Sequence, residues 1–88
     1  MTSVTVRFFA AARAASGCGE RVVRVADPAT VESALAEVRA ELAESERAAF
    51  DSVVARCSFL VNAVATREPE HPLVDGDVVD VLPPFAGG

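Results

Sequence analysis

Two strand-like runs lie at opposite ends of this 88-residue chain, with an amphipathic helical segment between them. In the first run Val4, Val6 and Phe8 recur at every second position, and residues 77–82 form the last run. This alternation is typical of strands that bury one face. If the two strands pair at the centre of one sheet they must be parallel, because the connection between them contains the helical segment.

A second strand is predicted at residues 20–26, where Val23 and Val25 share a face. The small-residue stretch at residues 10–15 predicts about one helical turn. The sequence Ser-Gly-Cys-Gly at residues 16–19 predicts a turn after it. The close spacing across this glycine-bearing connection predicts that the first two strands form an antiparallel hairpin.

The main helix has two candidate starts. Thr30 can serve as N-cap, with Glu32 in the first turn where the helix dipole favours a negative charge. The alternative places Asp27 at the cap and Pro28 at the first helical position. Either start gives one apolar face, formed by Val31, Ala34, Leu35, Val38 and Leu42. A shorter helix at residues 46–55 is expected to bury Ala49, Phe50, Val53 and Val54.

The remaining strands are expected at residues 58–63 and 77–82, the latter after a turn at Asp75-Gly76. The element order is therefore hairpin, helix and further strands. It predicts an α+β fold of the β-grasp (ubiquitin-like) type, a small mixed sheet packed on one main helix with an additional short helix. We expect residues 1–82 to form this domain and residues 83–88 to extend from it as a tail.

The tail carries the clearest functional signal. In the last strand Val79 and Val81 share one face, while Val78, Asp80 and Leu82 share the other, which predicts a partly exposed sheet face beside the tail. The prolines at residues 83–84 fix φ and favour an extended exit from the domain. The glycines at residues 87–88 lack side chains, so they could thread a slot too narrow for other residues. Together these residues predict a thin arm that delivers a terminal carboxylate to another protein's active site.

Composition and the scarcity of catalytic residues narrow the function further. Hydrophobic residues make up 51% of the chain, which fits a globular domain, and no run approaches the ~20 apolar residues of a membrane span. The net charge of −5, with no lysine, argues against nucleic acid or an anionic membrane as partner. Cys18, Cys57 and His71 have no metal-site spacing, and no hydrolase triad is evident. No secretion signal precedes the first strand, so we expect a cytoplasmic protein that is not catalytic alone and binds no cofactor itself.

Three segments resemble the small subunits of molybdopterin synthase, within the MoaD/ThiS-like sulfur carrier family. They are residues 6–13 (Val-Arg-Phe-Phe-Ala-Ala-Ala-Arg), residues 61–62 (Val-Asn), and residues 71–79 running into residues 82–88 (Leu-Pro-Pro-Phe-Ala-Gly-Gly). The resemblance spans essentially the whole chain, and the Pro-Leu-x-Asp-Gly-Asp segment combined with Pro-Pro-x-x-Gly-Gly is its most specific part. Phe85 departs from the pattern, since many relatives have a smaller residue there.

The resemblance implies a mechanism centred on Gly88, with Gly87 beside it. A ubiquitin-activating-type adenylyltransferase would use ATP to adenylate the Gly88 carboxylate, and sulfur from a persulfide donor would convert it to a thiocarboxylate. The tail would then enter the large subunit of molybdopterin synthase and give its sulfur to a cyclic pterin precursor of the molybdenum cofactor. The resemblance also implies a partner-docking surface, made up of Arg13, Leu82, Pro83, Pro84, Phe85 and Ala86.

Two alternatives remain at this stage. The chain could carry sulfur for thiamine, cysteine or another metabolite. It could instead be a ubiquitin-like modifier that joins Gly88 to lysines of target proteins. The absence of lysine rules out chains built through its own side chains, but not single tagging.

Overall fold

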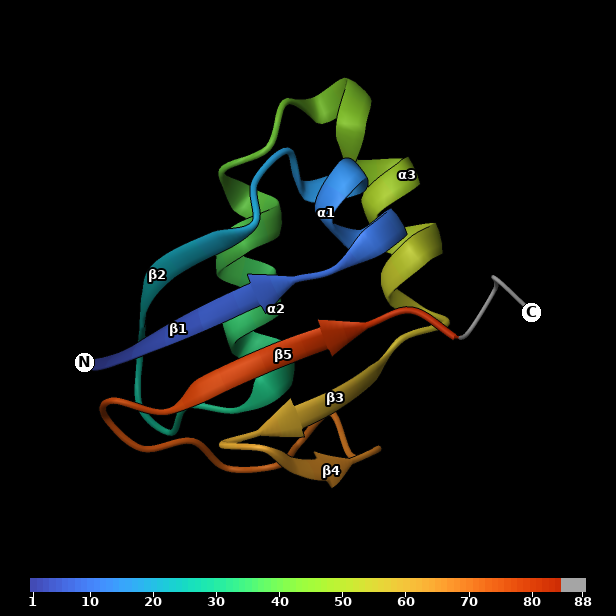
Figure 1. Ribbon diagram of the computed structural model, residues 1–88. Helices are drawn as coiled ribbons and strands as arrows, with labels where there is room; N and C mark the ends of the chain where they lie inside the picture. The colour runs from blue at the N-terminus through green and yellow to red at the C-terminus, as the bar shows by residue number, and fades with distance from the viewer. Residues whose placement is uncertain (85–88) are drawn as a thin grey trace.

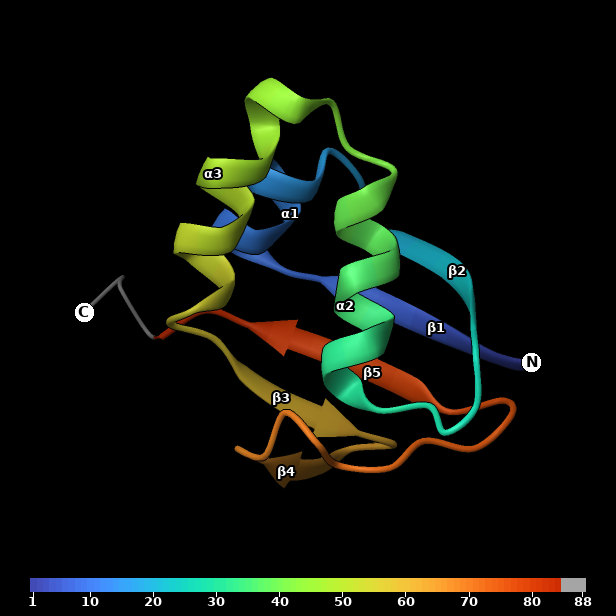
Figure 2. The same ribbon diagram turned by 180° about the vertical axis from the view of Figure 1, so that it is seen from behind.

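The computed structural model describes residues 1–84, which form five strands and three helices (Figure 1). The strands are β1 (Thr2–Phe8), β2 (Glu20–Val25), β3 (Ser58–Val61), β4 (Val64–Thr66) and β5 (Val78–Leu82). The helices are α1 (Ala10–Ser16), α2 (Val31–Ala40) and α3 (Glu44–Val54). Seen from behind in Figure 2, α2 lies across one face of the sheet.

The sheet has the mixed topology that the sequence predicts. Its strand order is β2-β1-β5-β3-β4, and β1 and β5 are parallel, with Val6 opposite Val79. The other three pairings are antiparallel. The first and last strands are therefore neighbours near the centre of the sheet, and the crossover between them contains α2.

Thr30 is the residue that starts α2. Its Oγ1 accepts a hydrogen bond from the Ser33 backbone N–H at 3.1 Å, and its own N–H donates to Ser33 Oγ at 2.8 Å. This reciprocal pair is a capping box, which satisfies backbone donors that the helix leaves free. The alternative start at Asp27 is wrong. The Asp27 carboxylate instead accepts hydrogen bonds from Thr2 Oγ1 and from the N-terminal ammonium group.

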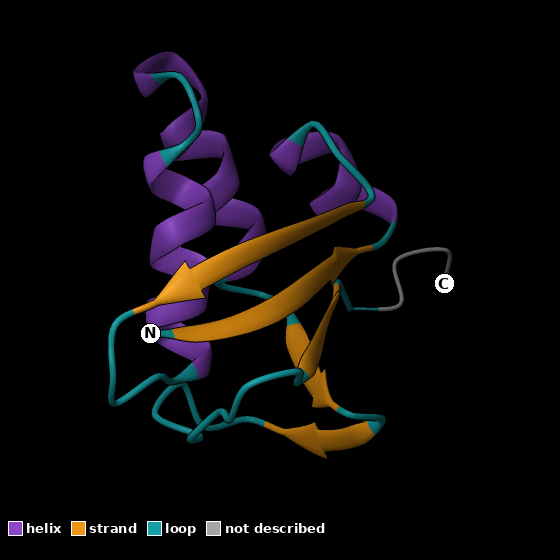
Figure 3. Ribbon diagram, turned by 90° about the vertical axis from the view of Figure 1, so that its left-hand side faces the viewer, coloured by secondary structure: helices purple, strands orange, loops and turns teal. Residues whose placement is uncertain are grey.

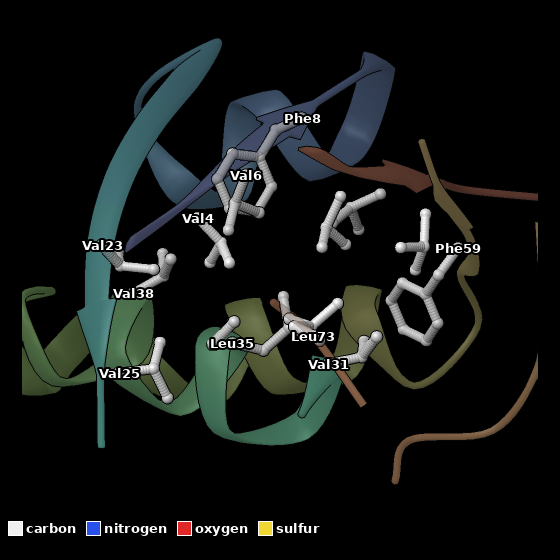
Figure 4. Close-up of a cluster of buried hydrophobic side chains, with 14 of the residues drawn as sticks. Val4, Val6, Phe8, Val23, Val25, Val31, Leu35, Val38, Phe59 and Leu73 are labelled. Carbon is white, nitrogen blue, oxygen red and sulfur yellow. The ribbon is translucent and has the colours of Figure 1, made fainter. Parts of the chain in front are cut away.

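The core forms where α2 meets the sheet. All five residues of the predicted stripe, including Leu42 beyond the end of α2, are buried. Figure 4 shows side chains of β1 on one side of this core and side chains of α2 on the other. Burial of these aliphatic groups removes apolar surface from water, which is the main force that holds the helix on the sheet.

Helix α3, which corresponds to the shorter helix predicted at residues 46–55, is only partly as predicted. α3 buries Phe50, whose ring meets Phe8 edge to face with 6.2 Å between centroids. Val53 and Val54 are half-buried, and Ala49 is exposed, so its predicted burial is wrong. α3 packs mainly against α1 rather than across the sheet, and this contact covers only a narrow stripe of the helix.

The third strand is shorter than predicted, and a further strand follows it. β3 ends at Val61 because Asn62 and Ala63 adopt positive φ values of 48° and 70° and reverse the chain into β4. Two consecutive positive φ values suit a two-residue hairpin turn, for which Asn-Gly is the common sequence. Alanine at the second position hides this turn in the sequence, because a side chain rarely adopts that conformation.

Replacement of Leu35 by alanine tests the register of α2. Leu35 is 8% exposed and faces the core, so Leu35→Ala should lower the free energy of unfolding by ~2–5 kcal/mol through cavity formation. The matched control is Glu37→Ala, an exposed position on the same helix, which should change it by no more than ~0.5 kcal/mol. Urea denaturation measures both. An unchanged midpoint for Leu35→Ala would show that the helix register is wrong.

Candidate functional site at the end of β5

The candidate site begins where β5 ends. Leu82, the last residue of the strand, lies opposite Ser58 of β3 and is half-buried. Pro83 is half-buried and Pro84 is exposed. Phe85, Ala86, Gly87 and Gly88 lie outside the described residues, so their predicted roles stay predictions.

A small hollow lies directly beside this exit. It has a volume of about 180 Å³ and combines residues of α1, α3, the turn after α3 and the start of the tail: Ala11, Ser52, Val53, Arg56, Pro83 and Pro84. Its walls are mostly apolar, and Arg56 adds one positive charge. No pattern in the sequence indicates that Ser52 and Arg56 are neighbours of the prolines. They come there because α3 leads directly into β3, which pairs with β5, and this topology leaves no local signal in the sequence.

Arg13 occupies a different place from the prolines. It is exposed on α1 and lies against the α1–β2 turn, where a Cβ added to Gly19 would be 3.4 Å from its Cζ atom. It lines a separate, open hollow together with Cys18 and Gly17. Among the described residues, the structure therefore groups Pro83 and Pro84 in one hollow but leaves Arg13 outside it.

Asp80 is buried, whereas the sequence predicted that it would lie on a partly exposed face. The sequence placed its carboxylate on a partly exposed face with Val78 and Leu82, and those two residues are indeed half-buried. Asp80 itself is buried, because Arg7 of β1 donates two hydrogen bonds to it, from Nε at 2.6 Å and from a terminal nitrogen at 2.9 Å. These hydrogen bonds, with the charge of Asp80, raise the pKa of Arg7.

The Arg7–Asp80 pair makes this part of the sheet face locally neutral. The parallel register sets Arg7 beside Asp80, and the antiparallel register sets Leu60 on its other side. Half-buried Leu60, Leu82 and Val78 thus surround a charge pair that is already satisfied. Such a surface suits docking of a protein, because an apolar partner can cover it without stranding an unpaired charge.

The described residues include two cysteines. Cys18 and Cys57 are both free and half-buried. Within residues 1–84, no group of three or more His, Cys, Asp or Glu side chains could hold a metal ion. None of the helices in that range is long and apolar enough to cross a membrane.

Comparison with known proteins identifies the family. Residues 6–88 match the ThiS family. The chain belongs to the ThiS family. It is 34% identical over 86 residues to the molybdopterin synthase sulfur carrier subunit of Chlamydomonas reinhardtii, and the alignment covers 97% of this chain and 98% of that protein. The predicted resemblance to the small subunits of molybdopterin synthase is therefore confirmed.

Solved structures confirm the β-grasp fold. A chain in the protein-protein complex of subunits 1 and 2 of molybdopterin-converting factor from Helicobacter pylori has a TM-score of 0.63 and 28% identity, covering 99% of this ThiS-family chain and 100% of its own. The small archaeal modifier protein 1 of Haloferax volcanii has a TM-score of 0.78 and 22% identity, covering 97% and 100%. Because the identity to this second structure is only 22%, the similarity is evidence for the fold alone.

The Cys57 thiol should be slow to react. Burial raises the pKa of the thiol, so its thiolate fraction at pH 7 is small, and Sγ donates to the Val53 carbonyl oxygen at 3.2 Å. In a Cys18→Ser chain, we expect iodoacetamide to alkylate Cys57 more slowly in the folded than in the urea-unfolded protein. The folded rate should rise as the pH passes above the usual thiol range. Equal rates in the two states would contradict the described burial. In a Cys57→Ser chain, the same assay measures the alkylation rate of Cys18 alone.

Proposed function

We propose that this chain is the sulfur carrier subunit of a molybdopterin synthase and that Gly88 is the group that carries sulfur. The observation that carries this proposal is the 34% identity to a molybdopterin synthase sulfur carrier subunit across nearly the whole of both chains. The Gly-Gly sequence at residues 87–88 and the position of Pro83 and Pro84 at the end of a central strand support it.

The chemistry follows from the properties of a carboxylate. At neutral pH a terminal carboxylate is ionised and is a poor electrophile. An ATP-using adenylyltransferase would join it to AMP, which gives the carbonyl carbon a good leaving group. Sulfur from a persulfide donor would then displace AMP and leave a thiocarboxylate at Gly88. In this scheme ATP is bound by the activating partner, and the carrier itself holds no cofactor.

The body of the carrier would act as a rigid base for the tail. β5 is paired on both edges, with β1 as far as Val81 and with β3 as far as Leu82, so two registers hold the strand from which the tail leaves. Pro83 and Pro84 then restrict φ at the first two positions beyond the strand. A carrier needs this arrangement because the reacting carboxylate must reach a partner's pocket at a set distance from the docking surface.

The partner in the final step would be the large subunit of the synthase. The Helicobacter pylori relative was solved as a complex of subunits 1 and 2 of molybdopterin-converting factor. We propose that the equivalent large subunit covers the neutral sheet face around Leu82 and admits the tail to its own active site, where the pterin precursor accepts sulfur. The persulfide donor and the adenylyltransferase would be separate partners.

Blocking the carboxylate is the direct test. A C-terminal extension beyond Gly88 should abolish adenylation and thiocarboxylate formation, because the reacting group is no longer free. The same tag placed before Met1 is the matched control, since Met1 is 69% exposed. Intact-protein mass spectrometry after incubation with ATP, the adenylyltransferase and a sulfur donor reports the oxygen-to-sulfur mass gain. Acquisition of sulfur by the C-terminally tagged chain, with its tag intact, would refute the proposal.

Gly87→Val tests whether the tail must be narrow. A β-branched side chain restricts φ and adds bulk, so transfer of sulfur should be impaired even though the terminal carboxylate is unchanged. Gly87→Ala, which adds a single methyl group, should be less severe. Single-turnover transfer to the pterin precursor measures both variants. Full activity of Gly87→Val would show that no narrow slot receives the tail.

Leu82→Asp tests the docking face. The change puts a charge into the proposed interface, and an apolar anchor of this kind typically contributes ~1–3 kcal/mol to binding. The variant should keep its circular dichroism spectrum and bind the large subunit about 5- to 150-fold more weakly by calorimetry. The control is Val74→Asp, at a position 67% exposed in the loop before β5, which should bind normally. Unchanged affinity of Leu82→Asp would remove Leu82 from the interface.

A further inference from the structure

β2 is an open edge of the sheet, and β1 separates it from β5. It is the outermost strand on its side, and the opposite edge is formed by β4. β4 has only three residues, whereas β2 has six and pairs with β1 in an unbroken register over its whole length. In Figure 3, β2 is the uppermost strand, above the strand that starts at the N-terminus. Long, regular edge strands are templates for pairing with another chain unless a device blocks them.

The backbone of β2 presents alternate residues to this edge. Phe8 N–H donates to the Gly19 carbonyl oxygen at 2.9 Å, so these two opposed residues form a hydrogen-bonded pair. In an antiparallel ladder such pairs alternate with non-hydrogen-bonded ones. It follows that the N–H and C=O groups of Glu20, Val22 and Arg24 point away from β1, toward the open edge. The same three side chains lie on the sheet face opposite α2, where Val22 is 62% exposed.

We propose that this edge binds a second copy of the chain, through antiparallel pairing of the two β2 strands about a two-fold axis at Val22. In this register Val22 lies opposite Val22 of the second copy, and each Glu20 lies opposite an Arg24. Both edges present the same three residues, so every outward backbone group finds a partner. The exposed valine gains an apolar neighbour, and both cross-strand charge pairs are of opposite sign, which is the stabilising arrangement.

Other registers that keep the outward groups paired are worse. Outward backbone groups belong to every second residue, so the next register in either direction is a shift of two residues. That shift places Val22 opposite Glu20 or Arg24. A further shift of the same size places Glu20 opposite Glu20 or Arg24 opposite Arg24, and like charges directly opposite each other destabilise a sheet. On the inward side of β2, the charge of Arg21 is already paired with Glu41 at 2.6 Å, so it does not block the edge.

This pairing is compatible with the tail chemistry and does not depend on it. β1 separates β2 from β5, so a second copy on the β2 edge leaves the end of β5 uncovered. The contact involves one short strand from each copy and buries a small area. We therefore expect a weak dimer, which forms in a concentration-dependent way.

Sedimentation of the full chain tests the proposal. The mass should rise from 9.2 kDa toward twice that value as the protein concentration increases. Glu20→Arg and Arg24→Glu each create two like-charge pairs in the homodimer, so each should weaken self-association about tenfold. An equimolar mixture of these two variants restores both opposite-charge pairs in the heterodimer, and it should associate about as well as the unmodified chain. Glu68→Arg, an exposed position outside the sheet, is the charge control and should not change association.

Amide hydrogen exchange identifies the surface. As the protein concentration rises, exchange should slow at the outward amides of Glu20, Val22 and Arg24. It should not slow at Ala65, whose amide points outward on the opposite edge. Thermal unfolding of each variant shows whether it is folded, which matters for Glu20→Arg because Glu20 also lies beside Arg7. A chain that stays monomeric to about 1 mM would overturn the proposal. So would a dimer that the charge reversals leave unchanged, or one that the mixture of variants fails to restore.

Discussion

The parallel pairing of β1 with β5 is the contact on which the rest of the fold depends. It joins the two ends of the described chain, with Val6, Val79 and Val81 fully buried on its inner side. Two parallel neighbours require a crossover, and α2 supplies it while covering the apolar face that the strands create. β2 and β3 then add to the free edges of this central pair. Because β5 is internal, the residues that follow it leave from a strand held on both sides.

A polar turn sets the register of that central strand. Asp77 accepts hydrogen bonds from the Val74 N–H at 2.9 Å and from Asn62 Nδ2 at 2.8 Å, and Asn62 Oδ1 accepts one from the Val78 N–H at 2.9 Å. On the other side, the N–H of Gly76, at a φ of 90°, donates to the Ser3 carbonyl oxygen at 2.8 Å. β5 is thus tied at its start to both β3 and β1. A one-residue slip of β5 would break these hydrogen bonds and turn Val79 and Val81 away from the core. The turn at the start of β5 therefore also fixes where the strand ends and the tail begins.

The sequence predicted the features that depend on local patterns and missed those that depend on packing partners. Alternation located β1 and β5, and helical periodicity located the buried face of α2, because each element must bury one side. The exposure of Ala49 could not be foreseen, since it depends on how little of α3 its neighbour covers. The burial of Asp80 required the parallel register that brings Arg7 beside it. Arg56 likewise reaches the tail exit only through the order of strands, which no motif in the sequence encodes.

Arginine supplies every positively charged side chain, and in the structure most of its described contacts join separate elements. Guanidinium groups bind carboxylates or helix carbonyl oxygens and connect β1 to β5, β2 to the end of α2, and α2 to α3; these are Arg7, Arg21, Arg39 and Arg47. A guanidinium has a planar fork that suits such contacts and is too weakly nucleophilic to capture an activated carboxyl group, unlike the amine of lysine. With no lysine in the sequence, a chain adenylated at Gly88 as proposed would present no side-chain amine to attack that acyl group. If Gly88 is adenylated as proposed, the same composition that ties the elements together would leave the acyl group no lysine side chain to acylate.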